Sequence, residues 1–177
     1  GLGDVYKRQD YFGETNLLKN YGEIFLRFRE GTYAASDRVG QKSPEFSHKW
    51  GEHRFSSDQL KGQNCLLLFL DERGEFCKQA LQIAESVSLK ENLTPVILYI
   101  EKQPENIENR SGAIILEYTG KTASEYGVTG YPTLFLLDPE GTIRFVKIGY
   151  SPLLAEELEL AVRQILHDRP IQAQKNK

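Results

Sequence analysis

The two cysteines, Cys65 and Cys77, are the residues of this chain best suited to chemistry, because a thiolate can attack a disulfide. Cys65 begins an apolar run, CLLLFL, that is typical of a buried strand, whereas Cys77 lies near the start of a predicted helix. Five strand residues place Leu70 roughly 16 Å from Cys65. A disulfide needs two Cα atoms within about 7 Å. We therefore interpret Cys65 as a small core residue that does not pair with Cys77.

Two interpretations of Cys77 stay open from the residues alone. A helix N-terminus stabilises a thiolate and lowers the pKa of a cysteine placed there. The neighbouring carboxylates of Asp71, Glu72 and Glu75 act in the opposite direction and raise that pKa. Cys77 is either a half-buried helix residue without chemistry or a single reactive thiol.

Metal and nucleic-acid chemistry find no support in the sequence. His48, His53 and His167 are scattered, without the spacing of metal ligands, so we expect no metal and no cofactor. The formal net charge of -3 gives no electrostatic basis for binding nucleic acid. The sequence also lacks a run of about 18 apolar residues, the length that a membrane-spanning helix requires.

The predicted elements alternate between strands and helices. Apolar runs predict strands, and 3.6-residue periodicity predicts helices. Ser151 is suited to cap the last helix, with Pro152 at its first position. The elements, in order, are a strand at 65–70, a helix at 75–92, strands at 96–100 and 113–116, a short helix at 122–126, a hairpin of 134–137 with 142–148, and a C-terminal helix from Ser151. This order predicts an α/β sandwich around a mixed sheet.

The stretch from Tyr126 to Gly141, YGVTGYPTLFLLDPEG, is the most informative part of the chain. Asp138 to Gly141 has the residue types of a tight turn and joins the two strands of the hairpin. Pro132 precedes the first of those strands, where it removes no ladder hydrogen bond. An X–Pro bond is also the kind of peptide bond at which a cis geometry costs little, so we predict a cis bond between Tyr131 and Pro132.

This stretch resembles the thioredoxin-like fold, most closely thiol–disulfide oxidoreductases of the TlpA/ResA/MauD type. The resemblance rests on Tyr126, Gly127, Val128, Gly130, Pro132, Thr133, Phe135, Leu136 and Asp138. An earlier segment is similar to the lead-in of redoxin domains, through Val39, Gly40, Pro44, Phe46, Leu60, Lys61 and Gly62. The resemblance covers about Val39 to His167 and implies a three-layer sandwich, a mixed central sheet with helices on both faces.

The resemblance also implies where the reactive site lies. Such proteins carry a Cys-x-x-Cys at the junction of a strand and a helix. Laid on this sequence, the motif places Gly74 at the nucleophilic cysteine and Cys77 at the second cysteine. Acids that assist proton transfer in such proteins fall on Leu68 and Ala80. The site is therefore degenerate, and a reactive Cys77 would be more exposed because Gly74 leaves space.

Three functions follow from this comparison. The first is an extracytoplasmic protein of thiol–disulfide exchange or partner maturation, with at most monothiol activity through Cys77. In such proteins the groove beside the proline, here Tyr131 and Pro132, binds an extended protein or peptide. The second is a non-catalytic module that binds a partner in the same groove. The third is a peroxiredoxin-like peroxidase, whose Pro-x-x-x-Thr-x-x-Cys signature would place Leu70 and Gly74 at its Pro and Thr.

The ends of the chain differ from its middle. Residues 1–9 contain DVYKRQ, which one common sequencing-library adapter end encodes, so we expect an artefact of a bacterial metagenomic read and exclude it from the fold. Residues 10–38 hold an amphipathic helix or linker, with an apolar stripe at 16–30. The domain is expected at 39–168, followed by a polar tail at 169–177. A targeting segment or membrane tether could precede these residues in the natural protein.

Overall fold

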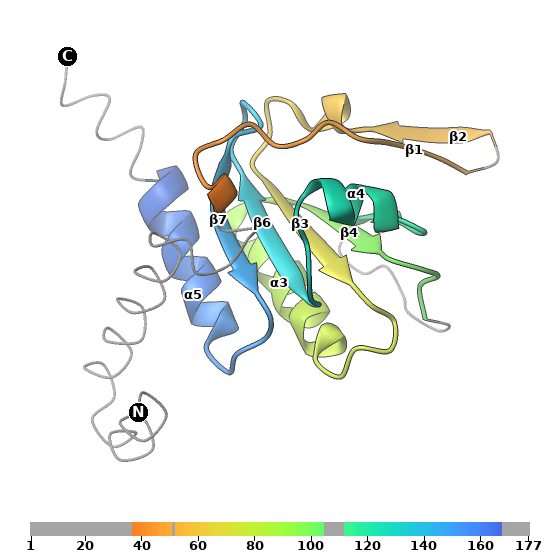
Figure 1. Ribbon diagram of the computed structural model, residues 1–177. Helices are drawn as coiled ribbons and strands as arrows, with labels where there is room; N and C mark the ends of the chain where they lie inside the picture. Colours follow the sequence, from red (N-terminus) through yellow and green to blue (C-terminus); the bar gives the residue numbers. More distant parts are fainter. Residues whose placement is uncertain (1–36, 51, 105–111, 168–177) are drawn as a thin grey trace.

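In the computed structural model, the central element is a five-stranded mixed sheet of order β5-β4-β3-β6-β7 (Figure 1). The structure describes residues 37–50, 52–104 and 112–167. β3 pairs in parallel with β4 and antiparallel with β6, and β7 continues the antiparallel half. The strands are β3 (Cys65–Leu70), β4 (Thr94–Tyr99), β5 (Ile114–Leu116), β6 (Thr133–Leu137) and β7 (Ile143–Ile148). The predicted α/β sandwich with a mixed sheet is confirmed.

β3 is buried on both faces because alternate residues serve two different cores. Leu66, Leu68 and Leu70 point into a core with the helices α3 (Cys77–Glu91) and α5 (Leu154–Ala161). Cys65, Leu67 and Phe69 point into the opposite core, as the period of two in a strand requires. The continuous apolar run therefore reflects a central strand that is covered on both sides.

The second core is covered by α4 (Gly120–Glu125) and by the hairpin of β1 (Ser47–Trp50) and β2 (His53–Ser56) (Figure 1). A short helix, η3 (Ser57–Leu60), follows the hairpin. Phe46 and Tyr126 meet edge to face in this core, with ring centroids 6.1 Å apart. The Tyr126 hydroxyl donates to the Pro44 carbonyl at 2.9 Å, which fastens the lead-in segment to the domain.

Two predicted helix starts are wrong. α3 begins at Cys77 and not at residue 75, because Asp71 to Phe76 form consecutive turns. α5 begins at Leu154 and not at Ser151. The Ser151 hydroxyl accepts from the Leu153 N–H at 3.3 Å and donates to the buried Glu157 carboxylate at 2.8 Å, so it closes a turn ahead of the helix.

The predicted turn of the hairpin is confirmed and has a buried carboxylate at its centre. Asp138 is 1% exposed and accepts from the N–H groups of Glu140 and Thr142, each at 3.0 Å. Arg144 lies 3.5 Å from the same carboxylate. The turn that joins β6 to β7 is therefore fixed by charge-assisted hydrogen bonds.

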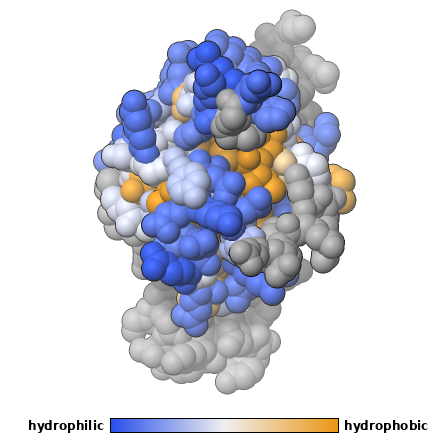
Figure 2. Space-filling view, turned by 90° about the vertical axis from the view of Figure 1, so that its right-hand side faces the viewer, coloured by the Kyte–Doolittle hydropathy of each residue, from blue (hydrophilic) through white to orange (hydrophobic). Residues whose placement is uncertain are grey.

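The predicted helix at 16–30, the expected adapter segment at 1–9 and the predicted polar tail at 169–177 lie outside the described residues. Within the part that the structure describes, no helix has the length and apolarity needed to cross a bilayer. On the face that lies at the right of Figure 1, hydrophilic residues cover most of the described surface around a smaller apolar area (Figure 2).

Candidate functional site at the junction of β3 and α3

The segment from Asp71 to Cys77 connects the central strand to α3 through two consecutive turns. The Gly74 N–H donates to the Asp71 carbonyl at 3.0 Å, and the Cys77 N–H donates to the Gly74 carbonyl at 3.3 Å. The Asp71 carboxylate accepts from the Arg73 N–H at 3.0 Å. These bonds place Gly74 directly ahead of Cys77, which is the first residue of α3.

The Cys77 sulfur occupies the place that a side chain at position 74 would take. A Cβ atom built on Gly74 would lie 2.5 Å from the Cys77 Sγ. In a disulfide, the Cβ of one cysteine lies about 3 Å from the sulfur of the other, given an S–S bond of about 2.04 Å. Positions 74 and 77 therefore have nearly the spacing of a paired dithiol, although only one of them is a cysteine.

The thiol of Cys77 is closed off from solvent. The residue is 5% exposed and belongs to the core between the sheet and α3. Burial raises the pKa of the Cys77 thiol, and the nearby Asp71 charge raises it further, while a hydrogen bond with the Asp71 backbone acts in the opposite direction. The expectation that a reactive Cys77 is more exposed beside Gly74 is wrong, because the sulfur itself fills the space that Gly74 leaves.

Tyr131 and Pro132 lie beside this junction. Thr133, the first residue of β6, pairs with Phe69 near the end of β3, so the preceding Pro132 flanks the start of the connection to α3. The peptide bond between Tyr131 and Pro132 is cis. Tyr131 packs against the core that contains Cys77, and its pKa is raised by burial and by the Asp71 charge. Sequence reasoning thus selected residues that the fold brings together around Asp71.

The two positions that the resemblance assigns to a proton-transferring acid are apolar core positions. Leu68 and Ala80 are both fully buried, in the same core as Cys77. The core that contains the thiol is therefore apolar at both of these positions, and such an environment disfavours a charged thiolate.

An aromatic pair beside the junction is not evident from the sequence. Phe76 and Tyr150 stack in parallel, with ring centroids 4.9 Å apart and an interplanar angle of 5°. Phe76 is 44% exposed, whereas Tyr150 is half-buried against the core. The helix predicted at 75–92 would place Phe76 on its buried apolar stripe. This is wrong, because α3 begins at Cys77, two residues later than predicted. No local signal links residue 76 to residue 150.

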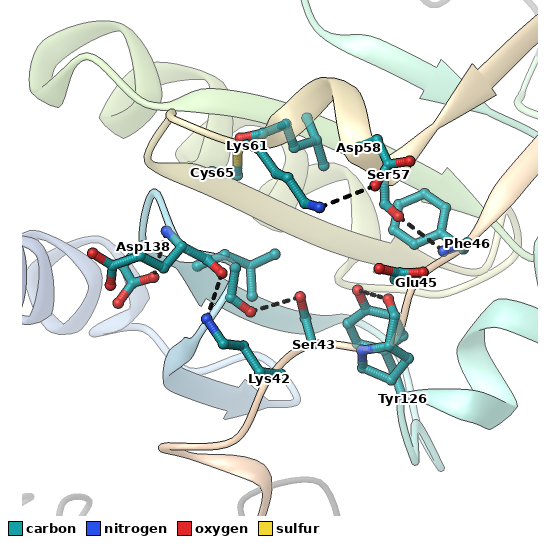
Figure 3. Close-up of a pocket in the computed structure, with 15 residues that line it drawn as sticks. Lys42, Ser43, Glu45, Phe46, Ser57, Asp58, Lys61, Cys65, Tyr126 and Asp138 are labelled. Atoms are coloured by element: carbon teal, nitrogen blue, oxygen red, sulfur yellow. Dashed lines mark hydrogen bonds and ion pairs between the residues drawn. The ribbon is translucent and has the colours of Figure 1, made fainter.

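The opposite end of the sheet holds a pocket of about 270 Å³, and several of the polar side chains that line it bond to other lining residues (Figure 3). Lys42 donates to the Glu140 carbonyl at 2.8 Å, Ser43 to the Gly141 carbonyl at 2.8 Å, and Lys61 pairs with Asp58 at 3.4 Å. Cys65 lines this pocket and is 1% exposed, and burial raises its pKa to about 12. It lies on the other face of β3 from the core of Cys77, so the interpretation of Cys65 as a core residue is confirmed.

Metal binding has no candidate site in the described ranges. There, the histidines, cysteines and carboxylates form no group of three that could hold an ion.

No protein-family model matches the sequence, and no curated protein matches it. Solved structures do. A chain described as the thiol:disulfide interchange protein DsbE from Chlorobium tepidum is 20% identical, with a TM-score of 0.62 over 71% of this chain and 96% of that one. An exposed lipoprotein thioredoxin from Streptococcus pneumoniae is 15% identical, with a TM-score of 0.56 over 69% of this chain and 100% of that one.

A 2-Cys peroxiredoxin from Plasmodium vivax matches as well, at 17% identity and a TM-score of 0.56, over 75% of this chain and 99% of that one. At these identities the likeness concerns the fold. The sheet order, the helices on both faces and these neighbours together show that the chain has the thioredoxin-like fold.

Proposed function

We propose that this protein binds a protein or peptide partner at the junction of β3 and α3 and does not carry out dithiol–disulfide exchange. The observation that supports this most directly is the Cys77 thiol, which is 5% exposed and fills the space beside Gly74. Of the functions considered, the geometry favours the non-catalytic binding module.

Exchange with a disulfide needs an accessible thiolate to attack and a second thiol to release the mixed disulfide. Here the attacking position is Gly74, and Cys77 is buried with a raised pKa. Cys65 belongs to the core on the other face of the sheet. Neither cysteine is placed to complete a dithiol cycle, whereas the surface beside Tyr131 remains partly open.

Monothiol activity is the second candidate, because Cys77 occupies the first position of α3, where the helix favours a thiolate. In that case Cys77 forms a mixed disulfide that an external thiol must resolve. Peroxidase activity is the third candidate function, and its support is the likeness of the fold to that of a peroxiredoxin.

An extracytoplasmic location, with a tether upstream of the sequence, is part of the proposal. Its support is the likeness to a protein described as an exposed lipoprotein.

The test is reduction of insulin with dithiothreitol as electron donor, for the wild type, Cys77→Ser and Gly74→Cys. We expect the wild type and Cys77→Ser to match the uncatalysed rate. Gly74→Cys should gain turnover, because the new sulfur can reach Cys77 after a shift of a few tenths of an ångström.

Wild-type turnover that Cys77→Ser abolishes would refute the proposal in favour of a reactive thiol. Consumption of hydrogen peroxide by the wild type, lost in the same variant, would favour the peroxidase. A folded Gly74→Cys variant without turnover would show that position 74 is not the nucleophile position.

A further inference from the structure

The turn between β3 and α3 presents a group of acidic side chains. Asp71, Glu72 and Glu75 lie within six residues that contain a single cation, Arg73. Among the described residues, none of these three carboxylates forms a salt bridge, whereas buried carboxylates elsewhere, such as Asp138, do. The turn therefore carries negative charge that is available to a partner.

The same turn ends in an aromatic ring that is both exposed and held in place. Phe76 leaves 44% of its surface accessible, and its ring rests in parallel on Tyr150 at 4.9 Å. Tyr150 in turn packs on the core. A ring supported in this way loses little freedom when a ligand stacks on it, which favours binding.

Asp71 connects this turn to the rest of the site. Its carboxylate is partly exposed and acts electrostatically on both the Tyr131 hydroxyl and the Cys77 thiol. An anion thus stands at the centre of the candidate site, with Phe76 a few residues along the same turn.

We infer that this surface, formed by Asp71, Glu75, Phe76 and Tyr150, binds an arginine side chain of an extended partner segment. The guanidinium group suits it because it can stack on an aromatic ring while it donates two parallel hydrogen bonds to a carboxylate. A lysine ammonium group interacts less well with an aromatic ring and cannot donate two parallel hydrogen bonds to a carboxylate. The inference rests on the proposed function, since it names the chemistry that partner binding uses.

The experiment measures binding of the intact chain to four fluorescent nonapeptide libraries by anisotropy. The libraries share randomised, cysteine-free flanking positions and differ in the central residue, which is Arg, Lys, Gln or Glu. We expect the Arg library to bind about tenfold more tightly than the Gln library, as a charge-assisted pair plus stacking at an exposed site would give. The Lys library should fall between them, and the preference should weaken at high salt.

Matched variants assign the effect to the surface. Asp71→Asn keeps an acceptor for the Arg73 N–H and should abolish most of the Arg preference. Phe76→Leu should reduce binding about threefold, while Phe76→Tyr, which keeps a ring, should restore it. Glu52→Gln removes an exposed carboxylate from the turn between β1 and β2 and should change nothing. Thermal unfolding of each variant verifies that it folds.

The outcomes separate the inference from the proposed function. Equal binding of all four libraries, or an Arg preference that survives both Asp71→Asn and Phe76→Leu in folded proteins, would overturn the inference and leave partner binding intact. No binding of any library would overturn both.

Discussion

The two ends of the sheet treat their polar groups in different ways. At the Cys65 end, the side chains of Lys42, Ser43 and Asp138 form hydrogen bonds with the backbone of the turn between β6 and β7. At the Cys77 end, carboxylates lie beside an exposed ring, and in the described residues they form no salt bridges. The first end stabilises the domain, whereas the second is the end at which we propose that a partner binds.

The largest effect on stability should appear when one carboxylate at each end of the sheet is replaced by alanine and the two losses are compared. Asp138→Ala leaves the N–H groups of Glu140 and Thr142 and the Arg144 cation without their acceptor. We expect it to lower the free energy of unfolding by about 3 kcal/mol. Asp71→Ala, which loses a single exposed hydrogen bond, should cost about 0.5 kcal/mol. Urea unfolding of both variants checks this, and equal losses would remove the distinction between the ends.

A smaller effect should follow from adding a methyl group at position 74. The Cβ of Gly74→Ala would meet the Cys77 sulfur at 2.5 Å, so we expect a destabilisation of about 1 kcal/mol. In a Cys77→Ala background the clash with the sulfur is absent and only the tight contact of 3.2 Å with the Asp71 carbonyl remains, so the same substitution should cost less. This double-mutant cycle measures how closely the sulfur packs on Gly74. Additive effects would mean that the two positions do not touch.

The smallest effect concerns pH and the hairpin over the second core. His48 lies 3.0 Å from the buried Thr122 hydroxyl, and burial lowers the pKa of His48 while Glu125 opposes this. A histidine with a lowered pKa in the folded state contributes stability above its unfolded pKa of about 6.5 and loses it as the pH falls below that value.

Unfolding free energies between pH 8 and pH 5 should therefore decline more in the wild type than in His48→Gln. The difference between the two proteins isolates the contribution of His48 from that of every other group. A steeper decline in His48→Gln would contradict the direction of the shift.

Sequence patterns predicted the strands and the turn, which depend on neighbouring residues. They missed the features that depend on contacts between distant segments. The apolar run of β3, the strand of Leu134 to Leu137 and the turn at Asp138 each contain their own signal. The burial of Cys77 depends on where its sulfur lies relative to Gly74, which no periodicity records. The stack of Phe76 on Tyr150 joins two segments that the chain separates by most of the sheet.

The start of α3 shows the same limit. Glu75 and Phe76 tolerate helix, so the pattern begins the helix two residues too early. Hydrogen bonds from Gly74 to Asp71 and from Cys77 to Gly74 form turns instead and place the first helical residue at Cys77.

The rate at which native Cys77 reacts with iodoacetamide is the most direct test of the central claim. Peptide mapping by mass spectrometry would follow each cysteine at pH 7 and at higher pH, with the urea-unfolded protein as reference. A buried thiol with a raised pKa should react at least about a hundredfold more slowly than the same thiol in the unfolded chain. Native Cys77 that reacts as fast as the unfolded thiol, or faster, would contradict the account.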